Sequence, residues 1–306
     1  MRIAVSQFSP GDDPVANASA LVEAAAAAAR DGADLLLAPE GSIVSFLTDP
    51  AAPGRAAQPL DGPFVAALAQ ASADHGIVIA AGTFVPDPES TRVHNTLVVV
   101  EHGEVVAAYR KIHLYDAFSF VESDHVAPGT QTPPIVEING VTVGFATCYD
   151  LRFPEVFRVL QTGGAQVLAL ASAWVRGPLK EEHWLTLLRA RAIENTCYVV
   201  ASDQAGRAGI GRSAAFDPFG LQMLDLGTAD QGCGIVDISL DRVAEVRRIL
   251  PSAQHTRFRV DPVPRGPMPL PDPLPTAATR PTPTPTTTPT PTGSPSKDLY
   301  PAYQGG

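Results

Sequence analysis

Cys148 stands where an apolar strand pattern changes to a helix start, which is a common position for a nucleophile. The preceding run, VTVGFATC, alternates and contains β-branched residues like a strand, while Pro154 and Glu155 suit a first helical turn. At such a corner we expect the thiol to be exposed, and the partial positive charge of a helix N-terminus favours its thiolate. The backbone N–H of Tyr149 is a candidate donor to an oxyanion. The alternative is a small buried core residue, which is the usual role of a free cysteine.

Two charged residues follow other predicted strands. Glu40 comes just after the apolar run DLLLA, and Lys111 follows the strand-like EVVAA. Because sites in α/β proteins collect at the carboxyl ends of strands, we expect both side chains to lie near Cys148. A carboxylate can take the thiol proton, an ammonium can stabilise a tetrahedral oxyanion, and a thiolate can form an acyl intermediate. A Cys-His pair with His113 is the chemical alternative, and it would leave Glu40 and Lys111 without a role.

These residues and their flanks, PEGSI, YRKIHLYD and ATCYDLRFPEVF, resemble the motifs of the nitrilase superfamily of carbon–nitrogen hydrolases. The resemblance extends from MRIAVSQF to about Val260 and implies a catalytic triad of Glu40, Lys111 and Cys148. It also implies that Glu122 is a second glutamate, which orients the substrate amide and supports the lysine; a solvated loop carboxylate is the alternative. The resemblance implies no metal and no organic cofactor.

The eight residues that start at the cysteine, CYDLRFPE, resemble the Nit branch of this superfamily, which includes ω-amidases and deaminated glutathione amidases. Nitrile hydrolysers of the family usually read Cys-Trp-Glu, and carbamoyl hydrolysers tend towards Cys-Asn. The resemblance therefore implies an amidase that hydrolyses a small, carboxylate-bearing linear amide through a thioester. A nitrile or N-carbamoyl hydrolase is the alternative within the superfamily. A non-catalytic binding partner is a third interpretation, which the intact triad disfavours.

A fixed cation in the pocket would bind the carboxylate of such a substrate. The candidates are Arg176 and Lys180, in a loop after the strand-like VLALASAW, although loop cations are usually only solvated. Trp174 ends the same strand and is expected to form a wall of the pocket or to pack in the core. Arg152 is near Cys148 in sequence, but two nearby acidic residues predict a structural ion-pair cluster for it.

Strand-like and helical segments alternate from residue 2 to about residue 250, which predicts one large α/β domain. The expected strands lie near residues 2–8, 34–38, 77–83, 95–100, 104–109, 142–148, 166–171, 197–202, 213–217 and 233–237. The expected helices span residues 13–31, 62–75, 154–162, 181–195 and 240–248. The pattern alone also allows a doubly wound sheet, but the family resemblance implies a four-layer α-β-β-α sandwich.

The chain changes in character at about Asp261. Residues 261–306 hold 14 of the 30 prolines, many threonines and almost no apolar periodicity. We therefore expect a disordered or polyproline-like tail after a hydrolase domain of residues 1–260. Because the repeat is Thr-Pro rather than a charged PxxP peptide, a linker or bare tail is favoured over a ligand for a groove-binding module.

Properties of the whole chain limit its partners. The net charge of −10, with 32 acidic and 22 basic residues and no basic run, predicts no binding to nucleic acid. We expect neither a signal peptide nor a membrane span, and the three cysteines do not form a disulfide framework. These features predict a cytoplasmic protein with a small amide substrate. The family resemblance implies a homodimer or a larger homo-oligomer.

Overall fold

The computed structural model, which describes residues 1–118 and 120–260, contains two six-stranded sheets. The first has the spatial order β14 (Gly232–Asp237), β1 (Arg2–Gln7), β2 (Leu35–Leu37), β3 (Val78–Pro86), β4 (Val93–Glu101) and β5 (Glu104–Arg110). The second has the order β13 (Gln222–Asp225), β12 (Ala214–Phe216), β11 (Tyr198–Asp203), β10 (Val167–Ser172), β9 (Val141–Thr147) and β8 (Ile135–Ile138). In each sheet three neighbouring strands run parallel, and they are β1, β2 and β3 in the first and β9, β10 and β11 in the second.

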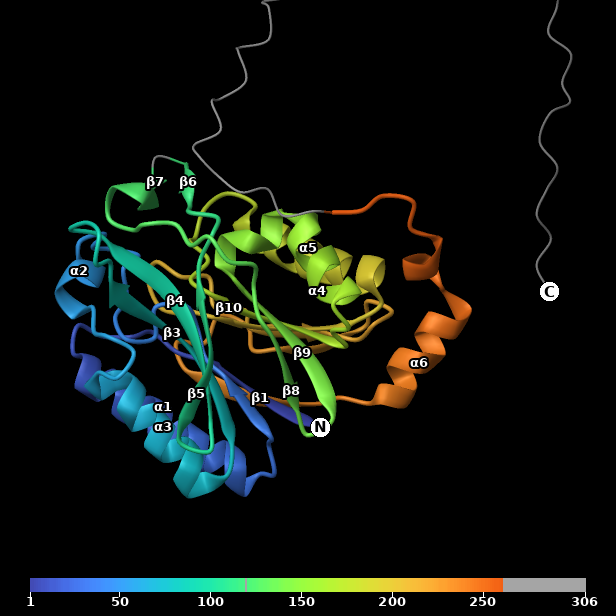
Figure 1. Cartoon of the computed structure of the whole chain (residues 1–306), viewed down its shortest axis with the longest axis horizontal. Coiled ribbons are helices and arrows are strands. Elements are labelled where there is room, and N and C mark those ends of the chain that lie inside the picture. The colour runs from blue at the N-terminus through green and yellow to red at the C-terminus, as the bar shows by residue number, and fades with distance from the viewer. Residues whose placement is uncertain (119, 261–306) are drawn as a thin grey trace, which may run out of the picture. The chain divides into compact units, whose positions relative to one another are not determined.

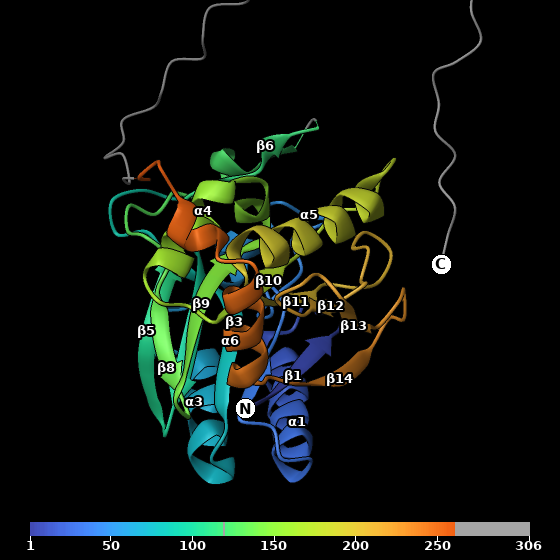
Figure 2. The same cartoon turned by 90° about the vertical axis from the view of Figure 1, so that its right-hand side faces the viewer.

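Helices cover the outer face of each sheet (Figures 1 and 2). The first sheet carries α1 (Pro14–Arg30) and α3 (Pro63–His75), and the second carries α4 (Pro154–Thr162) and α5 (Lys180–Asn195). The inner faces of the two sheets pack on each other through a separate apolar cluster that includes Phe145. This arrangement is a four-layer α-β-β-α sandwich, so the predicted fold class is confirmed.

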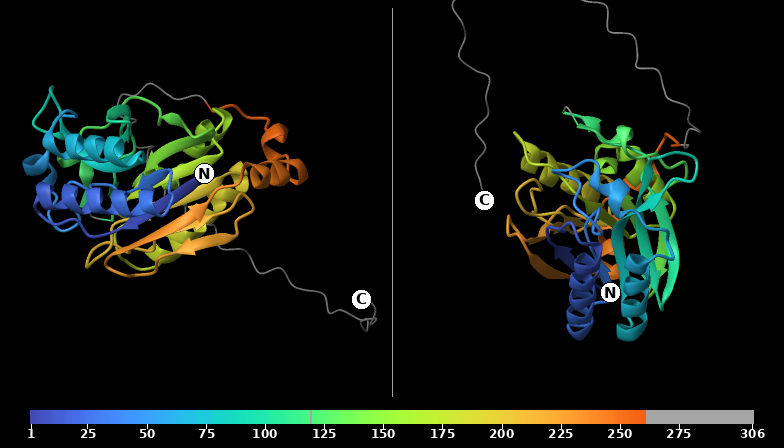
Figure 3. Two further views of the ribbon diagram at one scale, coloured as in Figure 1. Left: turned by 90° about the horizontal axis from the view of Figure 1, so that it is seen from below. Right: turned by 90° about the vertical axis from the view of Figure 1, so that its left-hand side faces the viewer.

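The last long helix lies apart from both helical layers. α6 (Leu240–Ile249) follows β14 and lies beside one end of the sandwich (Figure 3). Its Val243 packs into the apolar cluster between the two sheets. The Ser239 side chain caps its N-terminus by accepting a hydrogen bond from the N–H of Arg242 at 3.3 Å. The helix therefore closes the end of the inter-sheet core rather than a face of a sheet.

Helix boundaries follow signals that are visible in the sequence. The Asp13 carboxylate caps α1 by accepting a hydrogen bond from the N–H of Val15 at 2.9 Å, and a proline begins each of α1, α3 and α4. Gly76 ends α3 in the left-handed conformation with φ of +64°. Because these signals are local, the five predicted helices agree with the structure to within one residue at either end.

Some short elements are not predicted by the sequence patterns. They are β6 (Asp116–Ala117), β7 (Phe120–Val121), β8, β13 and the helix α2 (Ala52–Ala56). Two residues are too few to show a periodicity, and β8 and β13 are short edge strands. The sequence of α2, APGRA, contains a proline and a glycine, which argue against a helix. These elements add edges and loops without changing the layers.

Two further predictions concern the C-terminal tail and the absence of a membrane span. The tail predicted for residues 261–306 lies outside the described residues. Within residues 1–118 and 120–260, no helix is both long enough and apolar enough to cross a membrane.

Candidate active site

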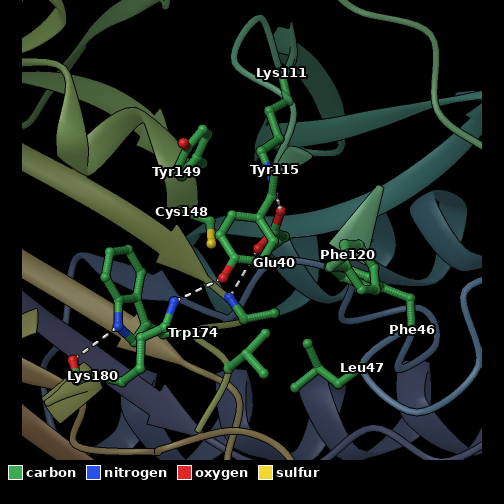
Figure 4. A pocket seen from close by; sticks show the side chains of 12 residues that line it. Glu40, Phe46, Leu47, Lys111, Tyr115, Phe120, Cys148, Tyr149, Trp174 and Lys180 are labelled. Atoms are coloured by element: carbon green, nitrogen blue, oxygen red, sulfur yellow. Dashed lines mark hydrogen bonds and ion pairs between the residues drawn. The ribbon is translucent and has the colours of Figure 1, made fainter. Parts of the chain in front are cut away.

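The structure brings Glu40, Lys111 and Cys148 into one pocket (Figure 4). Glu40 follows β2 and Lys111 follows β5, and these two strands run in the same direction within the first sheet. Cys148 follows β9 of the second sheet. Because the two sheets are packed face to face, strand ends from both sheets meet at this end of the sandwich.

Two glycines allow the close backbone contacts that position the carboxylate and the ammonium. A Cβ on Gly82 would lie 2.6 Å from the Cα of Glu40, and a Cβ on Gly129 would lie 2.1 Å from the carbonyl oxygen of Arg110. The N–H of Gly129 donates to the carbonyl oxygen of Lys111 at 2.8 Å. Any larger residue at either position would displace the backbone that carries a pocket residue.

Lys111 is held between two buried carboxylates. Its Nζ lies 2.8 Å from Oε1 of Glu40 and 2.9 Å from Oε2 of Glu122. The exposed fractions are 0% for Glu40, 1% for Lys111 and 3% for Glu122. Glu122 begins the 3-10 helix Glu122–Asp124, which directly follows the β6–β7 hairpin, and it is buried rather than a solvated loop carboxylate. The ammonium is thereby fixed in position before any substrate binds.

Asn95 belongs to this network and is absent from the sequence-based predictions. Its Nδ2 donates to Oε1 of Glu40 at 2.7 Å and to Oε1 of Glu122 at 3.0 Å. It lies on β4, where it is 1% exposed. The sequence does contain one indication of this role: Asn95 is an amide within the apolar strand VHNTLVVVE, and a buried polar side chain needs hydrogen-bond partners.

The predicted exposure of the Cys148 thiol is wrong. Cys148 is 7% exposed and begins a short 3-10 helix, Cys148–Arg152, while α4 starts only at Pro154. Its φ of +42° places it in the left-handed region, which is costly for a residue with a side chain. The Asp150 carboxylate accepts a hydrogen bond from the N–H of Thr147 at 3.0 Å and so fixes the corner.

The charges around the thiol favour its neutral form at rest. Burial, and then the negative charge of Glu40, raise the pKa of Cys148 well above its ordinary value, although Lys111 lowers it. Burial also raises the pKa of Glu40, against the opposing effect of Lys111. Burial by itself lowers the pKa of Lys111, but Glu122 and Glu40 outweigh it and keep the ammonium charged. The thiol therefore needs a base, and Glu40 is the neighbouring carboxylate.

Comparison with known proteins identifies the family. A model of the carbon–nitrogen hydrolase family matches residues 2–248. The chain belongs to the carbon–nitrogen hydrolase family. The predicted superfamily is thus confirmed, as is the prediction of a hydrolase that acts on carbon–nitrogen bonds other than peptide bonds.

Individual carbon–nitrogen hydrolases are similar over most of the chain. A deaminated glutathione amidase of Escherichia coli O157:H7 is 38% identical over 260 residues, which cover 84% of this chain and 98% of that protein. A CN-hydrolase superfamily protein of Xanthomonas campestris has a TM-score of 0.74 at 28% identity, covering 85% of this chain and 98% of that one. An amidase from Nesterenkonia sp. AN1, solved with acrylamide added to its active-site cysteine, has a TM-score of 0.65 at 28% identity, covering 82% of this chain and 98% of that one. The predicted resemblance to the Nit branch is confirmed.

Aromatic side chains and one more cation complete the pocket of this carbon–nitrogen hydrolase (Figure 4). Tyr149 and Trp174 line it, and Tyr149 packs edge-to-face against Tyr115 with 5.1 Å between ring centroids. Lys180, the first residue of α5, also lines the pocket. Its Nζ donates to the Tyr115 hydroxyl at 2.7 Å, and the Trp174 indole donates to its carbonyl oxygen at 3.0 Å. The remaining lining residues are Phe46, Leu47, Phe120, Ala173 and Val175.

The two residues predicted to bind the substrate carboxylate, Arg176 and Lys180, have different environments in the structure. Lys180 is 6% exposed and faces the pocket, whereas Arg176 is exposed, is not part of the lining, and donates to the carbonyl oxygen of Gly206 at 3.3 Å. The ion-pair cluster predicted for Arg152 does not form among the described residues. Arg152 instead stacks on Trp174, with its guanidinium carbon 4.8 Å from the ring centroid. Of the two predicted carboxylate-binding cations, only Lys180 is therefore placed to contact a ligand in the pocket.

His113 belongs to a different network from the pocket residues. Its Nδ1 lies 2.7 Å from Oδ1 of Asp150, and its ring stacks on Phe153 with 3.7 Å between centroids. The Tyr109 hydroxyl donates to the other oxygen of Asp150 at 2.9 Å. This network supports the corner that carries Cys148, which argues against the Cys-His alternative. Among the described residues, no group of His, Cys, Asp and Glu is arranged to hold a metal ion.

A pH prediction follows from the burial of Glu40. A general base must be ionised, so kcat/KM is expected to fall as the pH is lowered through the pKa of Glu40 in the free enzyme. Because burial raises this pKa, the midpoint of the acid limb is expected to lie above the ordinary value of 4.5. The check is a pH profile of kcat/KM measured over the range in which the protein stays folded. A midpoint at or below 4.5 would contradict the assignment.

Proposed function

We propose that this protein is a cysteine-dependent amidase that hydrolyses a small, carboxylate-bearing linear amide to a carboxylic acid and ammonia. The observation that carries the proposal is the position of Lys111, which bridges Glu40 and Glu122 in the same pocket as Cys148. A nucleophile, a base and a fixed cation are the groups that acyl transfer from an amide requires.

In the first half of the reaction, Glu40 takes the proton of the Cys148 thiol, and the sulfur attacks the amide carbonyl carbon. The C–S bond forms, and the Lys111 ammonium and the N–H of Tyr149 stabilise the resulting oxyanion. Glu40 then gives its proton to the departing nitrogen as the C–N bond breaks. Glu122 keeps Lys111 in place through their 2.9 Å contact and orients the substrate amide. The products of this half are a thioester on Cys148 and ammonia.

In the second half, water hydrolyses the thioester. Glu40 takes a proton from the water molecule, whose oxygen attacks the thioester carbonyl in the oxyanion site. The C–O bond forms and the C–S bond breaks, which releases the carboxylic acid and a thiolate. The proton then returns from Glu40 to Cys148. The same three side chains thus serve both halves of the reaction, and no metal or organic cofactor is needed.

The carboxylate of the substrate is assigned to the cationic side of the pocket. Among the described residues, Lys180 pairs with no carboxylate, and burial followed by the charge of Arg152 lowers its pKa. Arg152 also has a buried Nε that no described residue accepts. Arg152 is not part of the pocket lining, but Lys180 is, and a buried cation with no carboxylate partner among the described residues favours an anionic ligand. The similarity to a deaminated glutathione amidase supports such a substrate.

This assignment predicts different effects at two cations. Lys180→Met is expected to lower kcat/KM for carboxylate-bearing amides by about 10- to 100-fold, because a charge-assisted hydrogen bond is lost. For neutral aliphatic amides the change is expected to stay within about threefold. Arg176→Met is the matched control, since Arg176 lies outside the pocket lining, and it is expected to change neither value. Equal losses for charged and neutral amides in Lys180→Met would contradict the assignment.

The proposed reaction is tested with purified protein and a panel of compounds. The panel contains deaminated glutathione, α-ketoglutaramate and neutral aliphatic amides, with nitriles and N-carbamoyl amino acids as the other arm, and ammonia release is followed. The proposal predicts the highest kcat/KM for an amide that carries a carboxylate. Turnover of nitriles or N-carbamoyl compounds with no turnover of amides would refute it.

We also propose that residues 1–260 form the hydrolase domain, that residues 261–306 are an appended tail, and that the protein acts in the cytoplasm as a homodimer or larger homo-oligomer. The family match over residues 2–248 supports the first part. The three cysteines are all free, which suits a reducing compartment. Light scattering at micromolar concentration tests the assembly, and a monomeric mass would contradict it.

A further inference from the structure

Cys148, Ser172 and Asp203 form a row across the second sheet, at the carboxyl ends of three adjacent parallel strands. In the strand register, Thr147 is paired with Ala171, and Ser172 is paired with Asp203. Cys148 directly follows Thr147, the last residue of β9, so the three residues occupy neighbouring positions at the carboxyl ends of β9, β10 and β11. Ser172 and Asp203 are both 0% exposed. The row therefore extends from the pocket into the protein interior.

Two oxygens in this row lack a well-oriented hydrogen-bond partner among the described residues. They are Oγ of Ser172 and Oδ2 of Asp203. The strand register nevertheless places Ser172 beside both residues, and its hydroxyl is one of the groups that lower the pKa of Cys148, as a donor to the thiolate does. The other carboxyl oxygen of Asp203 is occupied, because it accepts a hydrogen bond from the N–H of Trp174 at 2.6 Å. Buried polar groups without a partner are costly, and here they lie beside the reacting sulfur.

The surroundings of Asp203 favour its protonated form. Burial raises the pKa of Asp203 well above its usual range, and the negative charge of Glu40 adds to the increase. The N–H groups of Trp174 and Gln204 and the Ser172 hydroxyl oppose this increase, because they stabilise the ionised form of the carboxyl group. A protonated carboxyl group donates one hydrogen bond, whereas a carboxylate only accepts. Because Oδ1 accepts from the Trp174 N–H, Oδ2 is the oxygen that can carry the proton of the acid form and donate it to a hydrogen bond with Ser172.

We infer that Ser172 is a further catalytic residue, and that Asp203 positions it: the Asp203 acid donates to the Ser172 oxygen, and the Ser172 hydroxyl donates to the Cys148 sulfur. This inference rests on the proposed function and deepens it. When the thiol proton passes to Glu40, negative charge develops on the sulfur, and the Ser172 hydroxyl stabilises it. No proton leaves Ser172 or Asp203, so the proton balance of the reaction is unchanged.

The first test compares Ser172→Ala with Ser202→Ala. Ser202 is a matched control because it is also fully buried on the neighbouring strand, but its hydroxyl donates to the Ser6 carbonyl oxygen in the first sheet. The readout is the rate at which methyl methanethiosulfonate modifies Cys148 at a series of pH values, followed by mass spectrometry of the Cys148 peptide. The charged and titratable groups that face this sulfur, which stay the same in both variants, are Glu40, Lys111, Tyr115 and Lys180.

Loss of a donor to a thiolate makes the thiolate harder to form. Ser172→Ala is therefore expected to slow Cys148 modification about tenfold at each pH, which corresponds to a profile displaced by about one unit towards higher pH. Its kcat for the preferred amide is expected to fall about 10- to 100-fold. Ser202→Ala is expected to keep the parent profile, even if its melting temperature is lower. An unchanged modification profile in Ser172→Ala would overturn the inference.

The second test separates donation by Asp203 from simple space filling. Asp203→Asn retains a donor at the position of Oδ2 and is expected to keep the modification rate and kcat within about threefold of the parent. Asp203→Ala removes the donor, and its rate is expected to fall about tenfold. If Asp203→Asn were as slow as Asp203→Ala, or faster than the parent, Asp203 would not act as a neutral donor. Because thiol modification needs no substrate, failure of this inference is distinguishable from failure of the amidase proposal.

Discussion

Replacement of Cys148 by alanine is expected to reduce amide hydrolysis by at least about 10,000-fold, because no acyl intermediate can form without the sulfur. The fold is expected to persist, since the change removes one atom from a side chain that borders the pocket. Ammonia release measures the first effect, and thermal unfolding measures the second. The matched control is Cys233→Ala, which removes an exposed thiol on β14 and is expected to retain full activity. Activity within tenfold of the parent in Cys148→Ala would refute the mechanism.

Replacement of Lys111 by methionine is expected to lower both activity and stability. The substitution keeps the length of the side chain but leaves Glu40 and Glu122 buried without a counter-charge. Breaking a buried ion pair in this way costs roughly 3 to 5 kcal/mol of the free energy of unfolding. Activity is expected to fall at least about 1,000-fold, because the oxyanion also loses its cation. Urea unfolding and ammonia release are the two measurements.

A double variant separates the two roles of Lys111. Lys111→Met combined with Glu122→Gln removes one of the two carboxylates that the single variant leaves unpaired. It is expected to recover part of the lost free energy of unfolding, with no recovery of activity. If the single variant unfolded at the same urea concentration as the parent, the buried charges would not depend on Lys111 in the manner described.

Local patterns in the sequence predict that Glu40 and Lys111 lie near each other, because both follow apolar runs and the carboxyl ends of like-directed strands share one edge of a sheet. Cys148 follows a strand of the second sheet, so its approach to them depends on the packing of the two sheets, which only the family resemblance implies. The environment of each side chain depends instead on distant segments. Cys148 is buried because Tyr115 and the segment that follows β10, residues 173–175, close around its pocket, and burial is then the largest influence on its pKa. The helix-start pattern predicts an exposed thiol, and this prediction is wrong because segments distant in the sequence bury it.

The direction of a side chain within a loop is a second property that the sequence patterns do not predict. Arg176 and Lys180 are both cations of one predicted loop and lie four residues apart, yet only Lys180 faces the pocket, because α5 begins there. Strand register is a third property that the sequence patterns do not predict. Cys148, Ser172 and Asp203 are neighbours only because β9, β10 and β11 pair in one particular register, which three separate apolar runs do not specify.

The thioester on Cys148 is the central claim, and trapping with hydroxylamine tests it most directly. A thioester reacts with hydroxylamine to give a hydroxamic acid, whereas direct attack of water on the bound amide gives only the carboxylic acid. We predict that the parent enzyme converts its preferred amide to the hydroxamic acid as the hydroxylamine concentration rises, with undiminished ammonia release, and that Cys148→Ala forms none. Exclusive formation of the carboxylic acid at high hydroxylamine concentration, with full ammonia release, would contradict the account.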